Sequence, residues 1–131
     1  MLFRSLTRRT AGLLLVGAGA AALVGPFVVR LFAQDQAPNR PEFTIVGKNF
    51  AYSPTRIEVT QDDLVKITVR SEDVAHSFAI DEYRIVKRVP AGGSTTFEFR
   101  ADRAGTFRFY CNLTNEAGHA QMHGDLVVKA K

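Results

Sequence analysis

Short segments in which apolar and polar residues alternate fill the chain from residue 42 to its end. Alternation with a period of two is typical of strands that bury one face, and turn-forming residues separate these segments. We therefore predict an all-β domain over residues 42–131, an antiparallel sandwich or small barrel of roughly seven or eight strands. The expected strands are 42–47, 56–60, 64–70, 76–80, 83–89, 95–101, 106–111 and 125–130.

Four phenylalanines on two successive segments are expected to form part of the core. They alternate with polar residues, and they are Phe97, Phe99, Phe107 and Phe109. The chain has one cysteine, Cys111, which cannot form a disulfide within the chain. The stability of the domain must therefore come from its core, and Cys111 is left for other chemistry.

The N-terminal region has a different composition. An uncharged stretch runs from Thr10 to Val29, and three arginines precede it. Twenty residues of helix reach roughly 30 Å, about the thickness of a bilayer core. We predict that residues 1–33 form a signal peptide or membrane-anchor helix, with Ala33 before a cleavage site in the first case. The arginines favour a body that is periplasmic or on the outer face of a bacterial inner membrane.

Residues 34–41 are polar and contain two prolines, so we interpret them as a linker. Of the 17 basic residues, four lie in the first 30 positions, and the other 13 are balanced by 13 acidic residues. The body is therefore neutral, and we expect no binding to nucleic acid.

One loop collects side chains that bind soft metals. Cys111, His119 and Met122 lie within twelve residues of one another. A thiolate, an imidazole and a thioether suit copper in both oxidation states. His76, at the start of segment 76–80, can supply a second imidazole if the two strands lie side by side. The sequence thus predicts a type 1-like copper site with His76, Cys111, His119 and Met122 as ligands.

Each of these residues also has an ordinary structural explanation. Cys111 could be an inert buried thiol, and His76 a hydrogen-bonded core residue. His119 could be exposed in the loop, and Met122 could serve packing alone. Whether two further loop residues join the site is left open; these are His123, which adjoins Met122, and Glu116, whose carboxylate could be an oxygen ligand.

Residues 42–131 resemble a cupredoxin. The segments VAHSFAI (74–80) and GTFRFYCNLTNEAGHAQMHGDLVV (105–128) are similar to the copper A domain of cytochrome c oxidase subunit II and nitrous oxide reductase. The resemblance implies a cupredoxin-like Greek-key β-sandwich. A copper A loop carries a second cysteine four residues after the first, whereas this chain has Asn115 there. We therefore expect a mononuclear site.

These features favour an electron-transfer protein over an enzyme. Four protein ligands leave no open position for a substrate, and no catalytic carboxylate pair or Ser-His-Asp set is apparent. The expected partners are redox proteins, such as a cytochrome or an oxidase-type complex, and the membrane if residues 1–33 are retained. Two alternatives are a copper-bearing subunit of a membrane redox complex and a copper storage or delivery protein.

Overall fold

The computed structural model describes residues 37–131. The predicted signal or anchor segment, residues 1–33, lies outside this range. Among the described residues, no helix is long and apolar enough to cross a membrane.

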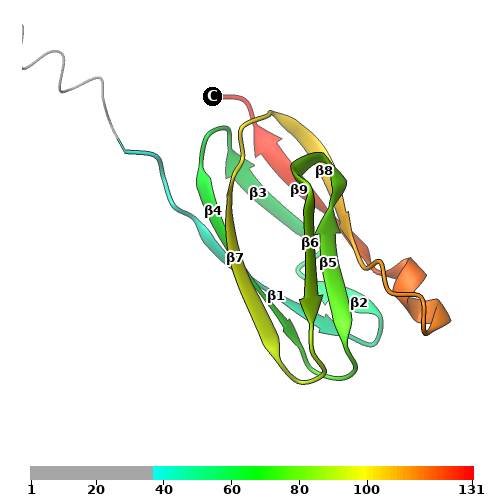
Figure 1. Ribbon diagram of the computed structural model, residues 1–131. Coiled ribbons are helices and arrows are strands. Elements are labelled where there is room, and N and C mark those ends of the chain that lie inside the picture. Colours follow the sequence, from blue (N-terminus) through cyan, green and yellow to red (C-terminus); the bar gives the residue numbers. More distant parts are fainter. Residues whose placement is uncertain (1–36) are drawn as a thin grey trace, which may run out of the picture. The chain divides into compact units, whose positions relative to one another are not determined.

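Two β-sheets pack face to face in this domain (Figure 1). One sheet has the strand order β2-β1-β4-β7 and the other has the order β3-β9-β8-β5-β6. The all-β sandwich predicted from the alternation is thereby confirmed. The strands are β1 (Glu42–Lys48), β2 (Ala51–Ser53), β3 (Arg56–Thr60), β4 (Leu64–Ser71), β5 (His76–Ile80), β6 (Ile85–Val89), β7 (Ser94–Arg100), β8 (Gly105–Tyr110) and β9 (His123–Lys129). Two short 3-10 helices are η1 (Asp81–Tyr83) and η2 (Ala117–Gln121).

The expectation of purely antiparallel sheets is wrong at two pairs. Strand β1 runs parallel to β4, and β3 runs parallel to β9. The chain passes from one sheet to the other between β2 and β3, so β1 and β4 become neighbours without a hairpin between them. The segment around Tyr52, which lies between the expected strands 42–47 and 56–60, forms the short strand β2.

The core lies between the two sheets and is largely aliphatic and aromatic. Phe78 of β5 stacks on Phe109 of β8 with 4.9 Å between ring centroids, and both rings are fully buried. Phe97 is also buried, whereas Phe99 and Phe107 are partly buried and pack against the core. The predicted core role of the four phenylalanines is confirmed. Each fully buried side chain of this size contributes roughly 1.5–3 kcal/mol of burial free energy.

The last residues before β1 are bonded to the body. The carbonyl groups of Asn39 and Pro41 accept hydrogen bonds from the backbone N–H groups of Leu64 and Lys66, at 2.9 and 3.0 Å. The proposed division into 1–33, 34–41 and 42–131 remains a prediction, but these bonds attach the end of the linker to β4.

One end of the sandwich carries the segments that build the candidate site. Strands β5 and β8 are antiparallel neighbours with Ala79 opposite Tyr110, so the start of β5 lies beside the chain that leaves β8. The β1–β2 turn, Asn49 and Phe50, reaches the same end, because the rings of Phe50 and His119 are 5.1 Å apart.

Candidate metal centre

The four residues predicted as ligands come from two segments, the start of β5 and the connection between β8 and β9. His76 opens β5, Cys111 follows β8, His119 lies in η2, and Met122 comes between η2 and β9. All four are buried, with exposed fractions of 0, 4, 0 and 1% respectively. Burial of two histidines and a cysteine at one end of a small sandwich requires an explanation, because apolar residues could fill this volume at less cost in desolvation.

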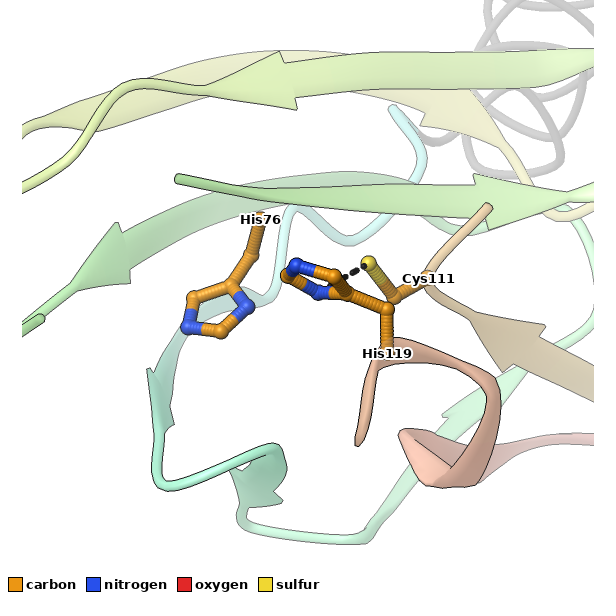
Figure 2. A group of neighbouring side chains, drawn as sticks. All are labelled: His76, Cys111 and His119. Carbon is orange, nitrogen blue, oxygen red and sulfur yellow. Dashed lines mark hydrogen bonds between the residues drawn. The ribbon is translucent and has the colours of Figure 1, made fainter. Parts of the chain in front are cut away.

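The side chains of three of these residues converge (Figure 2). The potential ligand atoms of His76, Cys111 and His119 all lie within 4.8 Å of one another. The Cys111 Sγ atom is 3.4 Å from Nδ1 of His119, and the two imidazole centroids are 5.3 Å apart. Ligand atoms that share one metal through bonds of about 2 Å lie roughly 3–4 Å apart. The group therefore fits a single metal ion after small side-chain shifts.

In each histidine, the Nε2 atom contacts a carboxylate and the Nδ1 atom is left for the converging group. Nε2 of His76 lies 2.7 Å from Oδ1 of Asp73, and Nε2 of His119 lies 3.3 Å from Oε1 of Glu116. Nδ1 of His76 faces the side chains of His119 and Cys111 (Figure 2) and is the one buried side-chain nitrogen or oxygen in residues 37–131 without a hydrogen-bond partner. A carboxylate on one nitrogen fixes a histidine so that the other nitrogen can bind a metal. A metal ion bound to Nδ1 would satisfy the orphaned atom.

Met122 lies against the same group. A Cβ atom added to Gly47 of β1 would lie 3.1 Å from Cδ2 of His76 and 3.6 Å from Cε of Met122. The His76 imidazole and the Met122 methyl group therefore both pack against the backbone of Gly47, which has no side chain. The Met122 carbonyl also accepts a hydrogen bond from the Cys111 amide at 3.2 Å, which closes the loop.

The Cys111 sulfur has two polar neighbours on β5. The backbone N–H of Ser77 is 3.4 Å from Sγ and the Ser77 hydroxyl is 3.6 Å from it. The same hydroxyl accepts a hydrogen bond from the Asn112 amide at 2.8 Å, which ties the start of the loop to β5. Hydrogen bonds to a ligating sulfur tune the reduction potential of its metal. Ser77 is therefore placed to tune the potential of a metal that Cys111 would bind.

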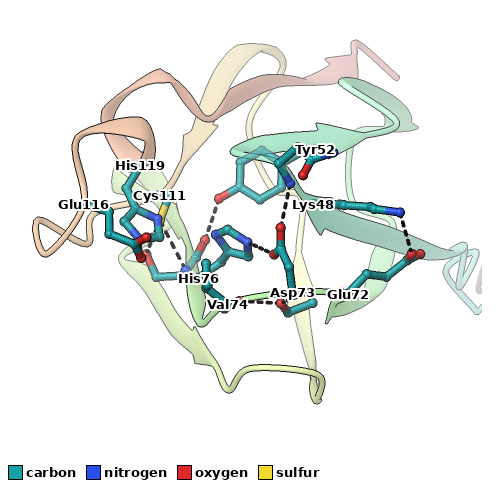
Figure 3. A network of polar contacts seen from close by, with 12 residues as sticks. Lys48, Tyr52, Glu72, Asp73, Val74, His76, Cys111, Glu116 and His119 are labelled. Atoms are coloured by element: carbon teal, nitrogen blue, oxygen red, sulfur yellow. Dashed lines mark hydrogen bonds and ion pairs between the residues drawn. The ribbon is translucent and has the colours of Figure 1, made fainter.

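Two further groups around the site have shifted pKa values. The Tyr52 hydroxyl donates to the Ser77 carbonyl at 2.5 Å (Figure 3), and burial, followed by the nearby Cys111, raises the pKa of Tyr52. The backbone N–H of Asn49 donates to Asp73, and this bond, together with the contact to His76, lowers the pKa of Asp73. Asp73 is therefore ionised at neutral pH and can accept a hydrogen bond from Nε2–H of His76.

Three other residues of the predicted metal-binding loop lie outside the converging group. Glu116 contacts the outer nitrogen of His119 and is not in the group that converges on Cys111. His123 is exposed at the start of β9. Asn115, at the position where a copper A loop has its second cysteine, is also exposed.

Reasoning from the sequence missed several residues that shape the site. They are Gly47, Phe50, Asp73 and Ser77. One signal was present, because Asp73 and Glu116 each precede a predicted histidine ligand by three residues. No comparable pattern marked Gly47 or Phe50, which reach the site from β1 and the turn that follows it.

Fold and site together define a β-sandwich with a buried Cys-His-His group at one end. The cupredoxin-like domain family matches residues 19–128, and the chain belongs to this family. Membership confirms the predicted resemblance and supports copper as the metal that suits these ligands.

Two oxidase subunit sequences are similar to this chain. The chain is 33% identical over 92 residues to cytochrome c oxidase subunit 2 of Thermus thermophilus, a match that covers 70% of this chain and 68% of the relative. A second subunit 2 sequence from the same species is matched over 55% of its length, so the chain corresponds to about half of that relative.

Solved structures agree with this assignment. The periplasmic domain of cytochrome oxidase subunit II from Bradyrhizobium japonicum has a TM-score of 0.61 at 17% identity, with 69% of this chain and 84% of that chain covered. Auracyanin A, a blue copper protein from Chloroflexus aurantiacus, has a TM-score of 0.58 at 18% identity, with 68% and 99% covered. At these identities the likeness is one of fold.

Proposed function

We propose that this protein is an electron carrier with one type 1-like copper ion held by His76, Cys111 and His119, with Met122 as the weak axial ligand. The observation that carries the proposal is the orphaned Nδ1 atom of His76, which is buried and lies in a group with the thiol of Cys111 and the imidazole of His119. Two imidazoles, one thiolate and a thioether are the donors typical of blue-copper electron-transfer sites.

Copper bound there would supply a one-electron couple between Cu(I) and Cu(II). The chain supports that couple by holding its ligands in a rigid frame. His76 is fixed by Asp73, His119 by Glu116, and Cys111 by Ser77. Ligands that do not move between oxidation states keep the cost of rearrangement low, which favours fast transfer.

A single copper is favoured over a pair. The chain has one cysteine, so no second thiolate is available to bridge two metals. Asn115, at the corresponding loop position, is exposed to solvent and lies outside the buried ligand group.

A carrier is also favoured over an enzyme or a storage protein. A catalytic metal needs an open position for its substrate, and the predicted ligands of this site are all buried. A storage or delivery protein should release its metal readily, which a buried and hydrogen-bonded ligand set opposes.

The body is proposed to act in the periplasm or on the outer face of the inner membrane, with cytochromes or an oxidase-type complex as partners. Support comes from the arginines that precede the uncharged segment and from those relatives that are oxidase subunits. A protease added to spheroplasts should digest the body or find it already released. Full protection within the cells would contradict this location.

A second candidate is a copper-bearing subunit of an oxidase-type complex, which the oxidase relatives favour. Purification from membranes distinguishes the two. A subunit should co-purify with haem in a fixed ratio, whereas a free carrier should separate from it.

Addition of Cu(II) to the purified protein tests the copper site. A strong visible band from sulfur-to-copper charge transfer should develop up to one equivalent and vanish on reduction. Binding with only the faint colour of nitrogen and oxygen ligands would contradict the thiolate site. The variant Cys111→Ser should lose the band, and the exposed variant His123→Ala should keep it.

A further inference from the structure

A strained turn brings an aromatic ring onto both histidines of the candidate site. Strands β1 and β2 are joined by the two residues Asn49 and Phe50, since Lys48 pairs with Ala51. Both turn residues have positive φ, 52° and 58°. Turns of this kind prefer Asn-Gly, because glycine accepts a positive φ without strain. Phenylalanine at the second position is therefore an unfavourable choice for the turn itself.

The Phe50 side chain accounts for this choice. Its ring meets His119 edge to face with centroids 5.1 Å apart and meets His76 at 6.1 Å, with interplanar angles of 88° and 90°. Phe50 is partly buried, whereas both histidines have an exposed fraction of 0%. The partly exposed ring thus contacts both of the buried imidazoles.

The loop that carries His119 is shaped to receive this ring. A Cβ atom at Gly118 would lie 2.4 Å from Cγ of Phe50 and within 2.7 Å of both Cδ atoms. Only the bare backbone of η2 fits against the ring at that distance. Glycine at 118 and phenylalanine at 50 are thus matched to each other across two segments far apart in the sequence.

The β1–β2 turn is also hydrogen-bonded to Asp73, the residue that orients His76. The Asn49 amide donates to Oδ2 of Asp73 at 2.8 Å, and Oδ1 of the same carboxylate contacts His76. The position of the ring and the orientation of His76 therefore depend on one connected set of contacts.

We propose that Phe50 is a specificity-determining residue that closes the metal centre to water and external ligands, and so restricts a bound copper to electron transfer. This inference rests on the proposed copper function. Backbone strain that persists at a functional site is expected where the strained residue has a role there. An aromatic ring that covers both imidazoles excludes small anions without itself binding the metal.

The test compares the full-length protein with three variants of Phe50 after loading with one equivalent of Cu(II). Phe50→Ala removes the ring, and Phe50→Gly removes it while also relieving the positive φ, so that a folded ringless protein is available. Phe50→Tyr keeps the ring. Phe107→Ala is the matched control, because Phe107 is another partly buried phenylalanine that packs on Tyr83.

Two readouts report closure, a titration with azide followed through the visible spectrum and the rate at which a chelator removes copper. The parent, Phe50→Tyr and Phe107→Ala should show no azide-dependent change. Phe50→Ala and Phe50→Gly should show a saturable azide-dependent change and lose copper about tenfold faster than the parent. About tenfold is the lower end of the range of effects seen when residues that support metal ligands are replaced.

The outcomes separate this inference from the proposed function. A parent protein that binds no copper through a thiolate would overturn the copper assignment itself. In the other case, the parent protein shows the sulfur-to-copper band while Phe50→Ala and Phe50→Gly resist azide and the chelator to the same extent as the parent. That result would overturn the role of Phe50 alone. So would a Phe50→Tyr variant that opens as far as Phe50→Ala.

Discussion

Replacement of Asp73 by alanine should weaken both the fold and the metal site. Asp73 accepts from Nε2 of His76 at 2.7 Å and from the Asn49 amide at 2.8 Å. The imidazole has an exposed fraction of 0%, so its N–H would lose its partner away from solvent. A buried donor left unsatisfied costs about 1–3 kcal/mol. The amide of the exposed Asn49 can bond to water instead and adds about 0.5 kcal/mol.

The expected loss is therefore about 1.5–3.5 kcal/mol in the free energy of unfolding of the metal-free protein, measured by urea denaturation. Copper affinity, measured by competition with a chelator, should fall roughly 10–100-fold, because Nδ1 of His76 is no longer directed at the metal. Asp73→Asn keeps an oxygen acceptor and should lose less in both measurements.

Asp102→Ala is the control, since Asp102 is an exposed carboxylate whose nearest charged partner, Arg103, is 3.8 Å away. Exposed pairs of this kind contribute about 0–1 kcal/mol. If Asp73→Ala unfolded at the same urea concentration as Asp102→Ala and kept the copper affinity of the parent, the assigned role of Asp73 would be wrong.

The ligand set and the aromatic residues lead to three further predictions. Met122→Leu should keep its copper and the visible band with a raised reduction potential, whereas Cys111→Ser should lose the band; equal losses would mean that the ligand roles are misassigned. Asn115→Cys should take up about two coppers and show one unpaired electron shared over both nuclei by EPR, if the loop retains a copper A backbone; one copper with the parent spectrum would limit the resemblance to the fold. Alkaline titration should show all three tyrosines ionising above their usual range, because burial or neighbouring carboxylates raise each pKa. Asp81→Asn should lower the value for Tyr110 alone, whose hydroxyl donates to Asp81 at 2.6 Å, and no change in that variant would refute the cause.

The sign of the tyrosine effect has a consequence for stability. A pKa raised in the folded state means that unfolding is favoured once the pH exceeds the ordinary value of tyrosine, because the unfolded chain then ionises first. The contribution of these groups is therefore complete below about pH 10 and is lost as the pH rises further.

Period-two alternation was sufficient to predict the sandwich, because a strand with one buried face imposes that pattern on its residues. Val65, Ile67 and Val69 alternate on β4 and are buried, whereas Leu64 is only partly buried. The short strand around Tyr52 escaped prediction, because its three residues hold too little alternation to mark a strand and a proline follows.

The three converging side chains could be predicted from residue chemistry, because a thiolate and two imidazoles are donors that suit one copper ion. Their surroundings could not be predicted. Gly47 contacts the site through the absence of a side chain, which no local pattern reveals. No pattern in the sequence marked Phe50, and its importance depends on a positive φ and on the distant Gly118, which only the folded chain brings together.

A crystal structure of the copper-loaded protein, with the metal located by anomalous scattering, tests the proposed copper site. We expect one copper peak bonded to Sγ of Cys111 and to Nδ1 of both His76 and His119. A copper bound to Nε2 of either histidine, with the carboxylate of Asp73 or Glu116 as a ligand, would contradict it, as would two copper peaks within the loop.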